Sequence, residues 1–307
     1  MSPLRGIVLK LLSVCAFVAM SSLIKAVRDT VPAGETVFFR AFFALPVILG
    51  WLAWRGELAT GFRTSNPMGH LWRGLVGTTA MGCGFAALGY LPFPEVTAIG
   101  YAAPLLVVIF AAMFLGEQVR LVRLSAVAMG IVGVLIVLSP RLSIGPEGVG
   151  TAETLGALLA LMGAVFAALA QVFVRRLVQT ESTATIVFYF SIIAALLGLA
   201  TLPWGWVVPT PLQAGALIVA GLLGGVGQIL LTSSYRLADA SLIAPFDYAS
   251  MLLAIIVGLA FFGEIPSPST LSGAAIIIAA GVLIIWRERQ LGLAREAQRK
   301  ITGKTGV

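Results

Sequence analysis

Long apolar runs are the feature that most limits what this chain can fold into. A helix needs about 20 mainly apolar residues to cross the hydrocarbon core of a bilayer. Runs of this kind follow one another along the whole chain, at residues 6–26, 34–54, 71–91, 95–115, 123–139, 154–175, 184–203, 212–235, 240–262 and 270–286. The pattern predicts an all-α membrane protein with ten transmembrane helices.

Composition supports a surface that faces lipid. Of the 307 residues, 59% are hydrophobic and only 11% are charged, whereas a soluble domain carries about 25% charged residues. We expect a lipid bilayer as partner and no nucleic acid, because the net charge of +7 comes from short loops and the C-terminus. The single histidine and the two separated cysteines, Cys15 and Cys83, predict no metal, no cofactor and no catalytic site.

The basic residues indicate which way the spans point. With ten spans both chain ends lie on one side, and sixteen of the 20 Lys and Arg residues fall there. Only Lys25, Arg28 and Arg141 fall on the other side, while Arg40 lies within a span. Cytoplasmic loops carry the excess of Lys and Arg, so we expect both termini in the cytoplasm. Residues at span ends, such as Arg73 and Lys25, are expected to snorkel to the lipid headgroups.

A repeated motif divides the chain into two halves. The run FLGE at 114–117 recurs as FFGE at 261–264, and Tyr101 matches Tyr248 at the same spacing. Other residues pair between the halves at a similar spacing, namely Gly6 with Gly156, Lys25 with Arg175, and Phe38 with Phe188. Each half holds five predicted spans. Because five is odd, the second copy enters the membrane inverted.

This repeat predicts the domain organisation and the class of function. Residues 1–140 form the first repeat, 151–290 the second, inverted repeat, and 291–307 a basic cytoplasmic tail that we expect to lie on anionic lipid. Inverted repeats are typical of secondary transporters, whose halves rock around a central site. A membrane enzyme would need clustered His, Asp or Cys near one interface, and a channel a selectivity ring. Both remain as alternatives that the sequence does not favour.

Particular runs resemble a known family. The Arg of the second span, in the run ETVFFR, and the two F-x-G-E turns resemble the EamA branch of the drug/metabolite transporter superfamily, over about residues 5–290. The runs at 71–74 and 239–248 are similar to a subgroup that includes riboflavin importers and S-adenosylmethionine carriers. The opening run at 2–10 is similar to riboflavin importers of alpha-proteobacteria.

The resemblance implies a multi-pass protein of the bacterial inner membrane that moves a small organic metabolite by alternating access. Riboflavin uptake is the expected activity. Carriage or export of an amino acid, S-adenosylmethionine or a related metabolite or drug is the alternative. The direction of transport, the coupling ion and a homodimeric state are left open.

Polar residues inside the predicted spans are candidates for contact with the cargo. A charge within the membrane costs about 2.5 kcal/mol or more, and Arg40 in the second span and Asp247 in the ninth bear such charges. Gln171 and Gln228 are uncharged polar residues in the sixth and eighth spans. For each of the four residues, the alternative is a bond that ties helices together.

The fourth and ninth spans are both interrupted by proline. Proline cannot donate a helix hydrogen bond and frees a carbonyl one turn back, and broken helices at matching positions of two repeats point to a central site. In the fourth span Pro104 follows Tyr101. In the ninth span Pro245 precedes Tyr248, the residue that matches Tyr101. We therefore predict that the substrate contacts Tyr101, Phe246, Asp247 and Tyr248. Ordinary helix packing is the alternative for the aromatic rings.

Overall fold

The computed structural model describes residues 3–58, 61–115, 121–142, 151–177, 179–237 and 244–302. Within these ranges the chain is a bundle of helices without strands. The helices are α1 (Pro3–Val27), α2 (Ala33–Phe42), α3 (Ala44–Trp54), α4 (Pro67–Ala87), α5 (Phe93–Gly100), α6 (Ala102–Leu115), α7 (Leu121–Leu142), α8 (Thr151–Leu177), α9 (Thr183–Ala200), α10 (Pro211–Leu237), the short 3₁₀ helix η1 (Ala244–Tyr248), α12 (Ala249–Phe262) and α13 (Pro268–Thr302).

Each predicted span contains helix. Among the described residues, seven helices are long and apolar enough to cross a membrane, and Phe246–Phe262 and Pro268–Leu283 are shorter apolar helices. The helix α4 is missing from both groups. An all-helical membrane protein is thus confirmed for the described residues, whereas the count of ten crossings stays a prediction.

Proline explains two breaks between helices. Pro104 leaves the Gly100 carbonyl without its helical donor, and α5 gives way to α6 at the next residue. Pro46 stands in the same relation to Phe42, where α2 gives way to α3. The first break was predicted and the second was not. The segment at 244–248 also departs from α-helix, since η1 is a 3₁₀ turn.

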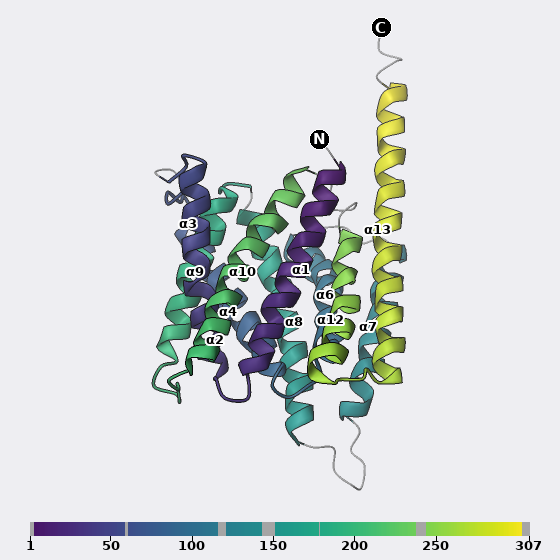
Figure 1. Cartoon of the computed structure of the whole chain (residues 1–307). Helices are drawn as coiled ribbons and strands as arrows, with labels where there is room; N and C mark the ends of the chain where they lie inside the picture. The colour runs from purple at the N-terminus through teal and green to yellow at the C-terminus, as the bar shows by residue number, and fades with distance from the viewer. Residues whose placement is uncertain are drawn as a thin grey trace.

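The helices run roughly alongside one another, and α1 begins at the end of the bundle where α13 finishes (Figure 1). We call this the termini end. The helix α13 continues to Thr302 and projects beyond its neighbours as one straight rod (Figure 1). As far as Thr302 the tail continues the last helix, and its contact with anionic lipid stays a prediction.

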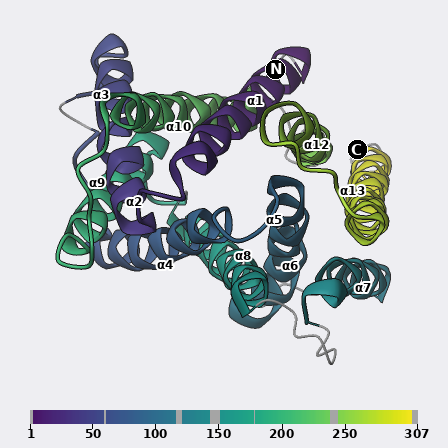
Figure 2. The ribbon, with the colours of Figure 1, turned by 60° about the horizontal axis from the view of Figure 1, so that its bottom comes forward.

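Helices far apart in sequence pack together. The closest pairings are α1 with α10, α4 with α8, and α7 with α13, and α2 lies against α9. Figure 2 shows α1 and α10 side by side, with α12 next to α1 and with α13 and α7 beyond α12. Between α7 and α13 the backbones nearly touch, because a methyl group on Gly273 would lie 2.6 Å from the Gly133 carbonyl oxygen.

Candidate functional site

Two arginines meet around one aromatic ring in the interior. The guanidinium carbon of Arg40 lies 5.7 Å from the centre of the Phe190 ring, and that of Arg73 lies 3.9 Å from it. Arg40 is on α2, Arg73 on α4 and Phe190 on α9. We call Arg40 and Arg73 the arginine pair. Cation–π contact with the ring offsets part of the cost of burying the two charges.

The pair lacks polar partners in the part of the chain that the structure describes. Arg40 is 6% exposed. Its Nε atom, and the Nε and Nη1 atoms of Arg73, are buried without a hydrogen-bond acceptor. Buried polar groups are nearly always hydrogen-bonded, and the charge of Arg40 also acts unfavourably on Arg73. The arginine pair is therefore the polar group in the interior that most needs explanation.

Small residues make room for the arginine pair. A methyl group on Gly77 would collide with the Arg73 guanidinium. One on Gly224 of α10 would come within 3.1 Å of both Arg40 Nε and Met20 Sδ. The pair thus lies where α1, α2, α4, α9 and α10 converge. Arg73 was expected to snorkel to lipid headgroups; the structure corrects this, because its side chain turns inward against Phe190.

The predicted site residues on the broken helices come together in a second place. The rings of Tyr101 and Tyr248 pack edge to face with centroids 5.2 Å apart, and the Tyr101 hydroxyl lies 2.6 Å from Ser250 Oγ. Asp247 Oδ1 pairs with Lys10 Nζ at 2.7 Å. Phe246, in the same turn, is partly buried.

Contact with Lys10 fits the helix-tying alternative for Asp247. Lys10 is 2% exposed, although the sequence placed it among the charges of the cytoplasmic surface. The hydroxyl of Tyr248 fills the place where a side chain on Gly281 of α13 would lie, so this ring packs between helices. Substrate contact by these residues stays a prediction.

The two glutamines are not drawn into either cluster. Gln171 is exposed on α8 and Gln228 is partly buried on α10. Among the described residues, no hydrogen bond joins them to the arginine pair or to Tyr101. Their predicted contact with cargo is left untested.

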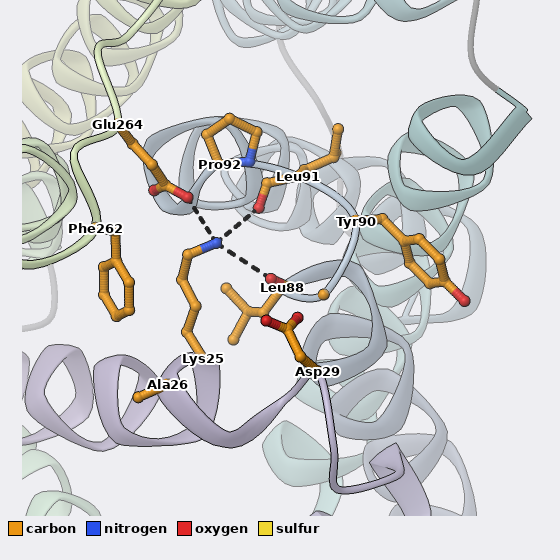
Figure 3. A pocket seen from close by; sticks show the side chains of 10 residues that line it. Lys25, Ala26, Asp29, Leu88, Tyr90, Leu91, Pro92, Phe262 and Glu264 are labelled. Carbon is orange, nitrogen blue, oxygen red and sulfur yellow. Dashed lines mark hydrogen bonds and ion pairs between the residues drawn. The ribbon is translucent and has the colours of Figure 1, made fainter.

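A third cluster of polar contacts lies at the end of the bundle opposite the termini. Lys25 Nζ pairs with Glu264 Oε1 at 2.8 Å, and it donates hydrogen bonds to the Leu88 and Leu91 carbonyl oxygens at 3.2 and 3.0 Å (Figure 3). The other Glu264 oxygen accepts the Phe93 amide at 2.7 Å. We call these groups the Lys25 cluster. It ties the end of α1 to the α4–α5 turn and to the turn after α12.

A pocket of about 410 Å³ opens beside the Lys25 cluster. Asp29, Tyr90 and the Phe262 ring line it together with Lys25 and Glu264 (Figure 3). The sequence treated Lys25 as a snorkelling residue, which the structure corrects. The signal that could have singled out Lys25 was its match with Arg175 between the two halves of the sequence.

Nearer the termini end, Glu181 fastens two loops. It lies between α8 and α9 and accepts hydrogen bonds from Thr64 Oγ1 at 2.8 Å and from the Ser65 and Asn66 amides at 2.7 and 3.1 Å. Burial alone would raise the pKa of this carboxyl, but the hydrogen bonds outweigh burial and the pKa is lowered. Glu181 therefore stays ionised and structural.

The geometry defines a helical membrane protein with buried cations in its interior and an ion-paired cluster at one end. The EamA-like transporter family matches residues 4–139 and 154–286. The chain belongs to this family, and it is a transporter rather than an enzyme.

Relatives carry different names. A pseudopaline exporter of Pseudomonas aeruginosa is 29% identical, over 91% of this chain and 95% of its own. An S-adenosylmethionine uptake transporter of Rickettsia bellii is 30% identical, over 83% and 84%. A riboflavin transporter of Rhizobium johnstonii is 31% identical, over 84% and 82%. A crystal structure of a protein 21% identical shares the fold, with a TM-score of 0.67 over 93% of this chain and 98% of that one.

Proposed function

We propose that this protein is a secondary transporter that moves a small organic metabolite across the bacterial inner membrane by alternating access. The observation that carries the proposal is the Lys25 cluster. Lys25 belongs to the first predicted repeat and Glu264 to the second, so the ion pair joins the two halves at one end of the bundle. In alternating access, contacts of this kind break when that end opens.

The repeat supplies an equivalent pair for the opposite end. Lys25 matches Arg175, and Glu264 matches Glu117. Glu117 and the side chain of Arg175 lie outside the described residues. Within the proposal, this second pair forms when the Lys25 cluster breaks, so that one end is closed at any time.

The proposal includes the orientation. Both termini lie in the cytoplasm, which makes the Lys25 cluster the closure on the outer side. A green fluorescent protein fused after residue 307 should then fluoresce, and alkaline phosphatase at the same place should be inactive. The reverse pattern would contradict this orientation.

Riboflavin is the first cargo to test, because the opening run of the sequence is similar to riboflavin importers and one relative bears that name. If riboflavin is the cargo, the purified protein in proteoliposomes will accumulate labelled riboflavin above the level of empty liposomes, and unlabelled riboflavin will compete. Absence of flux would reject riboflavin. Flux of S-adenosylmethionine or of an amino acid in the same vesicles would favour the alternative cargoes.

A further inference from the structure

We infer that the arginine pair is the binding site for an oxyanion on the cargo, a carboxylate or a phosphate. The inference rests on the proposed function, since it names the class of substrate that the carrier takes. The first observation is that Arg40 is 6% exposed and that its Nε donates to no acceptor in the described chain. A buried charge without a partner is strongly unfavourable. Such a charge is retained where a ligand supplies the missing partner.

None of the acidic side chains that the structure describes contacts the arginine pair, and Asp29 is exposed beside the Lys25 cluster. Glu35 accepts the Val207 amide at 3.1 Å near the start of α2, and Glu181 is bound by the loop at 64–66. The remaining acids with described partners are paired in other clusters, Asp247 with Lys10, Glu264 with Lys25, Glu57 with Arg55, and both Glu95 and Glu153 with Arg141. Within the described residues no carboxylate is left over for the arginine pair, and we take the missing anion to be part of the cargo.

Guanidinium groups recognise oxyanions in particular. Each presents a planar fork of N–H donors that matches a carboxylate or phosphate in bidentate geometry. Both guanidinium groups lie over the Phe190 ring, and Gly77 and Gly224 leave room for the two arginine side chains. The pair is thus preorganised for a ligand and is not held by internal hydrogen bonds.

This reading separates the named cargoes by their chemistry. S-adenosylmethionine bears a carboxylate, whereas riboflavin is neutral. An oxyanion site favours the former and disfavours the latter, although both names occur among the relatives. The class of cargo that we infer is therefore an organic anion or zwitterion.

Matched ligand pairs test the inference in detergent-solubilised protein. Each pair differs in the oxyanion: S-adenosylmethionine with its decarboxylated form, flavin mononucleotide with riboflavin, and succinate with succinamide. Binding is measured as the ligand-induced rise in melting temperature across a concentration series. At least one oxyanion should bind wild type more tightly than its neutral or decarboxylated partner, and the pair concerned tells carboxylate from phosphate.

Variants assign the binding to the arginine pair. Arg40→Gln and Arg73→Gln should each weaken binding of that oxyanion by about tenfold or more, because a charged hydrogen-bond partner is lost. Arg40→Lys keeps the charge without the fork and should fall in between. Arg55→Gln, whose side chain is 35% exposed and paired with Glu57, is the matched control and should bind like wild type.

A merely structural arginine would behave differently. If Arg40 served stability, Arg40→Gln would melt well below wild type without ligand; we expect a melting temperature at least as high, because an unpaired buried charge is removed. Equal binding of both members of every pair, binding of the neutral members alone, or no binding at millimolar concentration would overturn the inference. Riboflavin flux that persists in Arg40→Gln would refute the oxyanion site and leave transport standing. Binding of the oxyanion to wild type without flux of any cargo would support the oxyanion site and contradict the proposed transport.

Discussion

At the scale of single residues, the buried cations decide how the interior is held. Lys10, Lys25 and Arg40 each lie inside the bundle, but only the first two meet a carboxylate within the described chain. Intramembrane charges are costly and are tolerated where they are paired or functional. We therefore expect the pairing of Lys10 with Asp247 to stabilise the folded protein, and we expect Arg40 to contribute to binding of the cargo.

Asp247→Asn should lower the stability of the folded protein, because it leaves the ammonium of Lys10 buried without its carboxylate. Asp247 itself is 47% exposed, so the expected loss is modest, about 1 kcal/mol or more. Adding Lys10→Met should restore most of it. Thermal melting of the solubilised variants measures both effects, with Asp29→Asn as an exposed control.

A double variant no more stable than Asp247→Asn alone would show that the ion pair is not what the substitution disturbs. Altered transport in a variant that remains folded would instead place Asp247 in contact with cargo, as the sequence predicted.

At the scale of helices, close approach and proline breaks shape the bundle. Proline at 46 and 104 divides α2 from α3 and α5 from α6. Elsewhere helices approach through glycine, as α7 and α13 do at Gly133 and Gly273. In a bilayer such contact between small residues stabilises helix association, since lipid offers no hydrophobic driving force between helices.

Gly273→Ala should destabilise the packing of α13 against α7, since the added methyl group would lie 2.6 Å from a carbonyl oxygen. Overpacking of this kind costs about 1–3 kcal/mol. Gly215→Ala on α10 is the matched control, because nothing lies within 4 Å of its added methyl group. Melting temperatures of the two variants should therefore differ clearly. Equal values would mean that the two helices separate freely at this crossing.

At the scale of the whole molecule, the Lys25 cluster joins α1 to the turns beside α5 and α12, and we propose that it closes this end of the bundle. The ion pair is largely shielded, with side chains 10% and 17% exposed, so its loss should shift the balance towards an open end. The arginine pair lies deeper, beside Met20. The rate at which a water-soluble reagent reaches this region therefore reports whether the Lys25 cluster is formed or broken.

Glu264→Gln should open that end more often. The reporter is Met20→Cys in a background with Cys15→Ser and Cys83→Ser, and Met20 is 7% exposed. Glu264→Gln should make this cysteine react faster with a water-soluble thiol reagent than it does without that substitution. A shift of about 1 kcal/mol predicts roughly a fivefold faster reaction. Glu57→Gln, which removes an exposed ion pair elsewhere, should leave the rate unchanged. An unchanged rate in Glu264→Gln would mean that the cluster does not close the bundle.

The sequence by itself determined that the chain folds into membrane helices and which family it resembles. Apolar runs and scarce charges required helices in lipid, and Pro104 predicted the break at Tyr101, because these effects are local in the chain. Tyr101, Tyr248 and Asp247 were predicted to contact the substrate at one central site. The structure places them close together, and the substrate contact stays a prediction.

Only the tertiary structure decided which way each charge turns. Arg73 and Lys25 lie near span ends, where hydropathy cannot tell a side chain that reaches the headgroups from one that turns inward. The choice depends on neighbours more than a hundred residues away, Phe190 for Arg73 and Glu264 for Lys25. Such contacts arise from helix packing, and no local pattern encodes them.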